Sequence, residues 1–393
     1  MARRLTFPNE IYSGPGALDH LAEIPGRRVL LVADPFLTTL GIVERAVELL
    51  RCAERRVDVY DGVIPDPNRR SCEQAAAVAS ELEPDLIVAL GGGSAIDTAK
   101  VLWVKYEHPK LDWQKLTTFF ALPPLRQKAR LVAIPTTSGT GSEVSYAAMV
   151  TNETVELSIK ECVLSYDLCP DVVIADPTLT LSVPPNVTAW TGFDVLSHAL
   201  EASVSRFASD ITTGLASRAV RLVVRWLPVA YMDGRNLEAR VHLQQASMIA
   251  GMAMASAALG VMHSIAHALG TTFHYHHGLA CAFAMTQTVA FNSQVAAGNY
   301  AELARTALGI DVAEPLLACH RLVEMLDDLK CQVNIPLSLQ AAGVDAQRFE
   351  RARGQLVHLS SLDANRPSNP RDYTDKTLER LLAGIGSGVI SWD

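Results

Sequence analysis

Two stretches in the second half of the chain concentrate side chains that can bind a divalent metal ion. The stretch TGFDVLSHALEA contains Asp194 and His198, and HSIAHALGTTFHYHHG contains His263, His267 and His277. Carboxylate and imidazole groups are common ligands of Zn²⁺ and Fe²⁺. The alternative is that each histidine is a core residue with ordinary partners. Two pairs at the same spacing, followed by a His-His-Gly turn, favour a metal site.

The elements that must position these side chains are helices. Asp194 and His198 are four residues apart in a run with helical apolar spacing, so they project from one face, and His263 and His267 repeat that spacing. From Pro184 onward strand patterns fade and long Ala/Leu-rich segments take over. Helices are predicted over residues 187–205, 211–229, 236–258, 262–273, 278–297 and 314–329, with a last one around Leu378–Leu382.

A glycine-rich turn in the first half could bind phosphate. The strand PDLIVAL runs directly into Gly91–Gly93, and a helix is predicted to follow. Glycines let a backbone approach a ligand closely, and a helix N-terminus offers free N–H groups to an anion. Ser94 is expected to cap this helix and Asp97 to lie in its first turn. The alternative is a tight strand–helix turn, since this is not the GxGxxG pattern.

A second loop, IPTTSGTGSEVS, strengthens the case for a nucleotide. Its hydroxyl groups, from Thr136, Thr137 and Thr140, could surround a pyrophosphate or a nicotinamide. Asp34 ends the strand RRVLLVAD, where a carboxylate can accept from ribose hydroxyls and repel a 2′-phosphate, which favours NAD(H) over NADP(H). The alternative for Asp34 is a helix N-cap.

The order of elements predicts the fold class. A short N-terminal strand pair (Leu5–Phe7 and Ile11–Ser13) precedes alternating strands and helices, with helices over Val43–Arg51 and Ser71–Glu83. Such alternation predicts a parallel sheet covered by helices on both faces. We predict an α/β dinucleotide-binding domain over residues 1–184 and an all-helical metal and substrate domain over 185–393. A cleft between the two is a usual place for a small substrate.

Composition excludes several classes of protein. The 393 residues are 49% hydrophobic and 19% charged, as expected for a folded chain. A net charge of −8 without a Lys/Arg cluster argues against nucleic-acid binding. No apolar run reaches membrane-spanning length, and no export signal is evident. Seven cysteines without a CxxC pair are typical of reduced thiols, so we expect a cytoplasmic protein.

Taken together, these motifs resemble the iron-containing (group III) alcohol dehydrogenase family. The blocks GGGSAIDTAK, PTTSGTGSEVS, DPTLTLSVPP, TGFDVLSHALEA, HSIAHALG and HHG follow the order found in that family, over essentially the whole chain. The resemblance implies a Rossmann-like N-terminal domain and a helical C-terminal domain, an architecture shared with dehydroquinate synthase. It also implies a nicotinamide cofactor and Fe²⁺, with Zn²⁺ as the alternative metal.

The resemblance also assigns roles to residues. It implies that the metal is held by Asp194, His198, His263 and His277, and that His267 is a non-ligand that interacts with substrate near the nicotinamide. The cofactor contacts that it implies are Gly92, Gly93, Ser94, Asp97, Thr136, Thr137, Thr140, Lys160 and Leu179. No cysteine is in the implied ligand set, so no preference for a soft metal is expected.

Several positions depart from the usual pattern of the family. They are Ser203, Met254, His276 and the Pro65-Asp66-Pro67 segment. None is in the implied ligand set, so they bear on the substrate. His274 and His276 could line a pocket for a short polar or acidic aldehyde, or they could simply be residues of the turn.

The expected reaction is reversible hydride transfer between NAD(H) and a small primary alcohol/aldehyde pair. The metal would act as a Lewis acid, and His267 would position substrate or relay a proton. The alternatives are a glycerol-dehydrogenase-like polyol oxidoreductase, a dehydroquinate-synthase-like enzyme, and a metal- and NAD-binding protein without turnover. We expect a homodimer or larger homo-oligomer, with the N-terminal strand pair available to join a neighbour's sheet.

Overall fold

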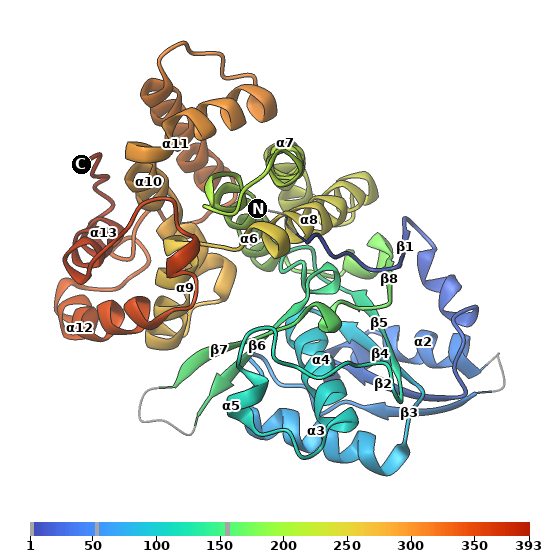
Figure 1. The fold of residues 1–393 in the computed structure, drawn as a ribbon. Helices are drawn as coiled ribbons and strands as arrows, with labels where there is room; N and C mark the ends of the chain where they lie inside the picture. The colour runs from blue at the N-terminus through green and yellow to red at the C-terminus, as the bar shows by residue number, and fades with distance from the viewer. Residues whose placement is uncertain (1–3, 52–54, 154–157) are drawn as a thin grey trace. The chain divides into compact units, whose positions relative to one another are not determined.

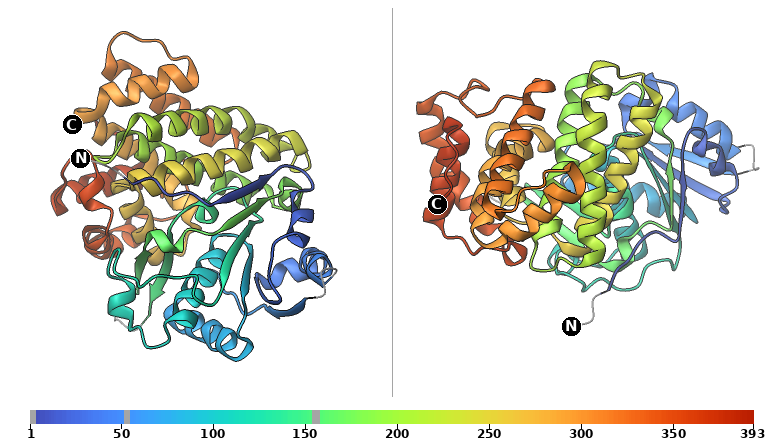
Figure 2. Two further views of the ribbon diagram at one scale, coloured as in Figure 1. Left: turned by 45° about the vertical axis from the view of Figure 1, so that its right-hand side comes forward. Right: turned by 90° about the horizontal axis from the view of Figure 1, so that it is seen from above.

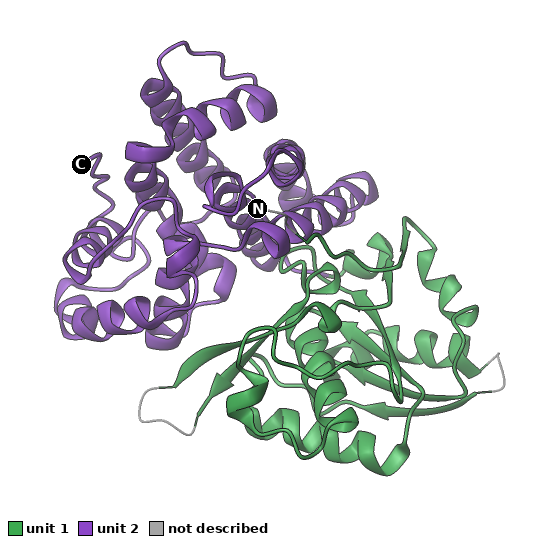
Figure 3. Cartoon of the chain, viewed as in Figure 1, with its two compact units in different colours: residues 1–182 green, residues 183–393 purple. Residues whose placement is uncertain are grey.

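The computed structural model describes residues 4–51, 55–153 and 158–393. The chain divides into two compact units, Met1–Ser182 and Val183–Asp393, coloured separately in Figure 3. The division falls two residues before the boundary predicted from the sequence. The first unit contains the sheets, and the second is helical throughout its described elements.

The first unit is built on a six-stranded parallel sheet with the order β1-β8-β5-β4-β2-β3 (Figure 1). Its strands are β1 (Glu10–Ser13), β2 (Arg28–Ala33), β3 (Arg56–Tyr60), β4 (Leu86–Gly91), β5 (Arg130–Pro135) and β8 (Val172–Ala175). Ala33 pairs with Leu90, and Gly91 pairs with Pro135. The segments that follow β2, β4 and β5 therefore all leave the sheet at the carboxyl ends of its strands, next to one another.

Both faces of this sheet are covered, as the βα alternation predicts. Leu30 and Val32 of β2 pack on one face, with buried residues of α3 (Arg69–Leu82) and α4 (Gly93–Glu107). Leu31 packs on the other face, with η1 (Ala17–Ala22) and α2 (Ile42–Arg51), because successive side chains of a strand point to opposite faces. The remaining short helices of this unit are α1 (Pro35–Thr39), α5 (Trp113–Leu116), η2 (Ser142–Val144), η3 (Tyr166–Leu168) and η4 (Pro177–Thr180).

One of the two predicted N-terminal strands is wrong. Leu5–Phe7 is not a strand, and β1 pairs in parallel with β8. Pro8 follows Phe7 directly and has no N–H to donate to a ladder, which is a reason for the strand to begin only after it. A separate antiparallel pair consists of β6 (Ala147–Asn152) and β7 (Ile159–Leu164).

The second unit confirms the predicted succession of helices. They are α6 (Pro185–Val204), α7 (Asp210–Met232), α8 (Leu237–Ala257), α9 (Val261–Phe273), α10 (His277–Leu308), α11 (Pro315–Gln332), α12 (Ala346–Leu362), η5 (Arg366–Ser368) and α13 (Asp375–Ser387). The long helices α7 and α8 lie side by side (Figure 2). Helix α10 runs past its predicted end, with a non-helical backbone at Ala296.

One long helix of the second unit, α12, has no counterpart in the prediction from sequence. Its apolar residues are few, and Gly354 interrupts them, so the helical period is weak. Within the described residues no single helix is long and apolar enough to cross a membrane. The bent pair α8 and α9, which meet at 109°, passes that test together, by length and composition only.

Candidate metal centre and cofactor loops

Three helices of the second unit carry the predicted metal ligands. Asp194 and His198 lie one turn apart in the middle of α6, and both are buried. His263 lies in the first turn of α9, and His277 is the first residue of α10. Asp194, His198 and His263 are at most 4% exposed, so their polar atoms face protein and not solvent.

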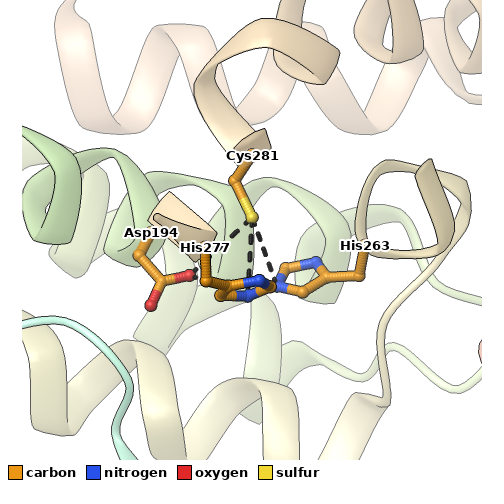
Figure 4. A group of neighbouring side chains, drawn as sticks. All are labelled: Asp194, His263, His277 and Cys281. Atoms are coloured by element: carbon orange, nitrogen blue, oxygen red, sulfur yellow. Dashed lines mark hydrogen bonds and ion pairs between the residues drawn. The ribbon is translucent and has the colours of Figure 1, made fainter. Parts of the chain in front are cut away.

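The ligand atoms of these helices converge, as Figure 4 shows. Asp194, His263, His277 and Cys281 each offer one ligand atom, and these four atoms lie within 4.8 Å of one another. His277 Nε2 is 3.5 Å from Asp194 Oδ1, and so is His198 Nε2. The His198 ring also stacks on that of His263, with centroids 5.0 Å apart. A largely buried cluster of one carboxylate and several imidazoles, of which His277 is half-buried, fits a divalent cation.

Gly278 explains how α10 approaches α6 closely enough to bring His277 to Asp194. A Cβ at this position would lie 2.6 Å from the carbonyl carbon of Trp190 and closer still to its oxygen. Trp190 lies one turn before Asp194 on the same helix. The His-Gly pair of the sequence is therefore a steric requirement of the site, because only glycine permits this backbone contact.

Glu201 orients one of the predicted ligands and was not identified from the sequence. Its Oε2 accepts a hydrogen bond from His263 Nδ1 at 2.6 Å, and its Oε1 accepts from the backbone N–H of Met262 at 2.7 Å. A carboxylate on Nδ1 leaves Nε2 as the nitrogen available to a cation. Glu201 is seven residues after Asp194 on α6, so helical spacing could have placed it on the ligand face.

His267 lies beside the cluster and has a carboxylate partner of its own. Its ring stacks on His277 with centroids 5.3 Å apart, and its Nδ1 is 2.7 Å from Asp363 Oδ2. Burial acts to raise the pKa of Asp363, but the nearby charge of His267 and the hydrogen bonds Asp363 receives outweigh burial and lower it. Asp363 comes from the turn after α12, and no sequence signal pointed to it.

His274 and His276 have local roles in the turn between α9 and α10. His274 is the C-cap of α9 with a left-handed backbone (φ 59°). His276 is the N-cap of α10, where its Nδ1 accepts from the N–H of Gly278 at 3.3 Å, and its ring packs against Trp190. Both side chains are exposed. These contacts favour the interpretation of both as turn residues.

In the first unit, the glycine turn and the threonine loop lie against each other. A Cβ on Gly92 would lie 3.3 Å from Thr137 Oγ1, and one on Gly93 would lie 2.8 Å from Thr140 Cγ2. Thr136 is buried at the end of β5. The two loops that the sequence suggested as one nucleotide site are therefore neighbours.

Asp34 adjoins the same turn. Its Cβ would lie 3.6 Å from a Cβ added at Gly91. Its Oδ1 accepts from the N–H of Phe36 at 2.9 Å, so it caps α1, which confirms the alternative given for it above. A carboxylate has further lone pairs, so this cap still leaves it able to accept from a ribose.

Two expectations about the helix after the glycine turn are wrong. The N-cap of α4 is Gly92 and not Ser94, whose Oγ instead accepts from the N–H of Asp66 at 3.3 Å. Asp97 is the fifth residue of α4, outside the first turn, and is buried. It accepts from Ser142 Oγ at 2.5 Å and from Met149 N at 3.0 Å. The reason is that α4 begins at Gly93, so the residue that separates it from β4 is Gly92, which has no side chain to form a cap.

Lys100, which sequence reasoning missed, anchors the loop that follows β5. Its buried ammonium donates to the carbonyl oxygens of Ser142, Ser145 and Ala147 at 2.7–2.8 Å. Burial lowers the pKa of Lys100, and the charge of Asp97 opposes that shift. Lys100 follows Asp97 by three residues on α4, and that charge pair was the signal that could have found it.

The other two predicted cofactor residues have protein partners. Lys160 on β7 forms an ion pair with Asp66, which stands in the Pro-Asp-Pro departure noted above. Leu179 lies in η4 and packs in the core between the sheet and α2. Their contact with a cofactor stays a prediction.

Comparisons with known proteins agree with this arrangement. A family model described as iron-containing alcohol dehydrogenase matches residues 8–177, and one for the C-terminal part of the same family matches residues 188–385. An NADPH-dependent butanol dehydrogenase from Clostridium saccharobutylicum is 34% identical over 388 residues, which cover 98% of both chains.

Solved structures give the same result. A 1,3-propanediol oxidoreductase superposes with a TM-score of 0.91 at 31% identity, over 98% of this chain and 100% of that one. A sulfoacetaldehyde reductase from Bifidobacterium kashiwanohense, in complex with NAD⁺, has a TM-score of 0.86 at 28% identity, over 98% and 99%. Fold, site and relatives define an oxidoreductase with a metal site and a nicotinamide cofactor. The chain belongs to the iron-containing alcohol dehydrogenase family.

Proposed function

We propose that this alcohol dehydrogenase catalyses reversible hydride transfer between NAD(H) and a small primary alcohol/aldehyde pair, with Fe²⁺ or Zn²⁺ as the metal. The observation that carries the proposal is the convergence of buried Asp194 and His263 with half-buried His277, beside a His267–Asp363 pair. Family membership favours this reaction over a glycerol-dehydrogenase-like or dehydroquinate-synthase-like one.

The residues present fit a divalent cation. The neutral imidazoles of His198, His263 and His277 with the Asp194 carboxylate would leave one net positive charge and room for a substrate oxygen. When bound, the cation supplies Lewis acidity toward that oxygen. Glu201 holds the His263 ring so that Nε2 faces the cluster. Because Asp194, His198 and His263 are buried, these donors act in surroundings that screen charge weakly.

His267 is our candidate for the group that handles the hydroxyl proton. Oxidation of an alcohol by NAD⁺ yields an aldehyde, NADH and one proton: the hydride goes to the nicotinamide, and the proton must leave the substrate oxygen. With Nδ1–H donated to Asp363, a neutral His267 has an unprotonated Nε2 that can accept that proton. The reverse reaction would use the same nitrogen as the donor.

Asp34 supports NAD(H) as the cofactor in preference to NADP(H). Its carboxylate stands at the end of β2 beside Gly91, where it would accept from ribose hydroxyls and repel a 2′-phosphate. We expect kcat/KM to be at least about tenfold higher with NAD(H) than with NADP(H), which corresponds to about 1.4 kcal/mol.

The test is a pair of variants. Asp34→Gly should reduce the ratio of kcat/KM for NAD(H) to kcat/KM for NADP(H), whereas Asp58→Gly on neighbouring β3 should not. Equal kcat/KM values for the two cofactors in the wild type would refute the proposal.

For the substrate, we propose short primary alcohols and their aldehydes. Relatives are named for butanol, 1-propanol and 1,3-propanediol, and one is named for sulfoacetaldehyde. The turn roles of His274 and His276 favour alkyl substrates over acidic ones. The test is oxidation of NADH by the metal-reconstituted enzyme across alkyl, sulfonated, phosphonated and carboxylated short aldehydes, with glycerol in the reverse direction. A preference for one acidic aldehyde would overturn this choice and make both histidines candidate specificity residues.

We further propose a homo-oligomer in a reducing cytoplasm. Strand β1 is the outermost strand at one side of its sheet, so its second edge is available to a strand of another copy. The six cysteines among the described residues are all free thiols. Sedimentation at micromolar concentration tests the assembly, and a monomeric profile would refute it.

A further inference from the structure

Cys281 stands inside the metal cluster, although nothing in its sequence context singled it out. It follows His277 by four residues on α10, so the two side chains project from the same helix face. Its side chain is fully buried. Figure 4 shows its sulfur directed at the other three residues of the cluster. Cys281 Sγ lies 3.6 Å from His277 Nε2, 3.9 Å from His263 Nε2 and 3.9 Å from Asp194 Oδ1.

These distances are those expected between ligands of one cation. With bonds of about 2.1 Å to nitrogen or oxygen and about 2.3 Å to sulfur, a sulfur ligand lies no more than about 4.4 Å from any other ligand atom of the same ion, whatever its coordination number, and all three distances are within that limit. A thiol that served only as a hydrogen-bond donor has one proton, so it would be directed at one acceptor. The sulfur of Cys281 is instead nearly equidistant from three atoms that are themselves ligand candidates.

We propose that Cys281 binds the metal ion through its thiolate, as a fifth protein ligand in addition to Asp194, His198, His263 and His277. The proposal rests on the metal site of the proposed function. The thiol proton is released when the metal binds. Two anionic ligands then neutralise the charge of a divalent cation, where Asp194 alone would leave it at +1.

A thiolate also changes which metal the site prefers. Sulfur is a soft ligand, which adds to the preference for Zn²⁺ over Fe²⁺ that nitrogen and oxygen ligands already show. The ligand set without Cys281 lacks this additional contribution from sulfur. We therefore expect the site to select Zn²⁺ when both metals are supplied in equal amounts.

The test is X-ray absorption spectroscopy of the full-length, Zn²⁺-loaded protein. We expect a sulfur scatterer at about 2.3 Å in the wild type, in addition to nitrogen and oxygen at about 2.0–2.2 Å. Cys281→Ser should lose the sulfur shell, and its Zn²⁺ affinity should fall at least about tenfold. That factor is the lower end of the loss in metal affinity seen when a hydrogen-bonding partner of a ligand is removed. Cys319→Ser, at another buried free cysteine on α11, should keep both.

The outcomes separate this proposal from the metal site itself. One equivalent of Zn²⁺ bound through nitrogen and oxygen alone would overturn the role of Cys281 and leave the site intact. A wild-type protein that binds no stoichiometric metal would overturn both. The wild-type spectrum alone shows whether sulfur is bound to the metal. The proposal can therefore be refuted even if the Cys281→Ser variant fails to fold. The Co²⁺-loaded wild type should also show a thiolate-to-cobalt charge-transfer band in the near ultraviolet.

Discussion

His267 donates a hydrogen bond from Nδ1 to Asp363 Oδ2 at 2.7 Å, although 96 positions of the chain separate the two residues. A carboxylate can only accept, so the contact fixes the proton on Nδ1 and leaves Nε2 as the basic nitrogen of the neutral ring. The ring also stacks on His277. The pair therefore places an oriented base next to the candidate metal ligands, and that base is not itself one of the ligands.

Replacing His267 should separate metal binding from turnover. We expect His267→Ala to bind one equivalent of metal and to lose about 10²–10⁴-fold in kcat, the usual contribution of a positioned acid–base group. The measurement is metal content by elemental analysis beside steady-state kinetics. Loss of the metal together with the activity would reassign His267 as a ligand.

Asp363→Asn should act through the orientation of His267. We expect a smaller fall in kcat, about 10–100-fold, because a hydrogen-bonding partner is lost while the imidazole stays. The Asn side chain no longer fixes the proton on Nδ1, so kcat should fall while the metal content stays unchanged. Asp372→Asn is the matched control, since Asp372 is exposed and pairs with Arg206 in a surface contact. A kcat in Asp363→Asn equal to that of Asp372→Asn would show that the carboxylate does not orient His267 for catalysis.

Gly278→Ala should disrupt the metal site through packing alone. The added Cβ would lie 2.6 Å from the Trp190 carbonyl carbon, so α10 must move away from α6 and carry His277 with it. We expect metal affinity to fall by more than about tenfold, since a ligand moves out of reach. Gly298→Ala on the same helix is the control: a Cβ there meets nothing within 4 Å, and it should raise stability by up to about 1 kcal/mol. Equal metal affinity in the two variants would contradict this account.

Glu143 should make the protein less stable as the pH rises through neutrality. The carboxyl group is buried in the loop after β5, and burial raises its pKa from 4.5 to about 7. The folded state therefore holds a proton that the unfolded state has released, so stability is full below pH 4.5 and declines until the pH passes about 7. The shift corresponds to at most about 3 kcal/mol at alkaline pH.

Glu143→Gln removes this dependence because an amide does not ionise. We expect the stability of the variant relative to the wild type to increase between pH 5 and pH 8, as measured by chemical denaturation across that range. Glu48→Gln on the exposed face of α2 is the control and should give a difference that does not vary with pH. A flat difference for Glu143→Gln as well would show that the carboxyl group is not protonated in the folded state.

Local patterns were enough to predict most of the elements and the helices that carry the candidate ligands. The alternation of buried strands with helices predicted the parallel sheet, and apolar spacing predicted the helices that carry Asp194, His198, His263 and His277. These signals are local because a helix face or strand face repeats within a few residues. The same reasoning missed α12, whose apolar period is weak, and misplaced the cap of α4.

Contacts between residues that are far apart in the chain could not be predicted from sequence spacing. Asp363 reaches His267 from the turn after α12, and Lys100 reaches carbonyl groups more than forty residues away. Cys281 was one of seven scattered thiols until the packing of Gly278 on Trp190 brought its helix face against α6 and α9. Residue types and periods specify each helix and strand, but the partners of a buried polar group depend on how those elements pack, which no short window of sequence contains.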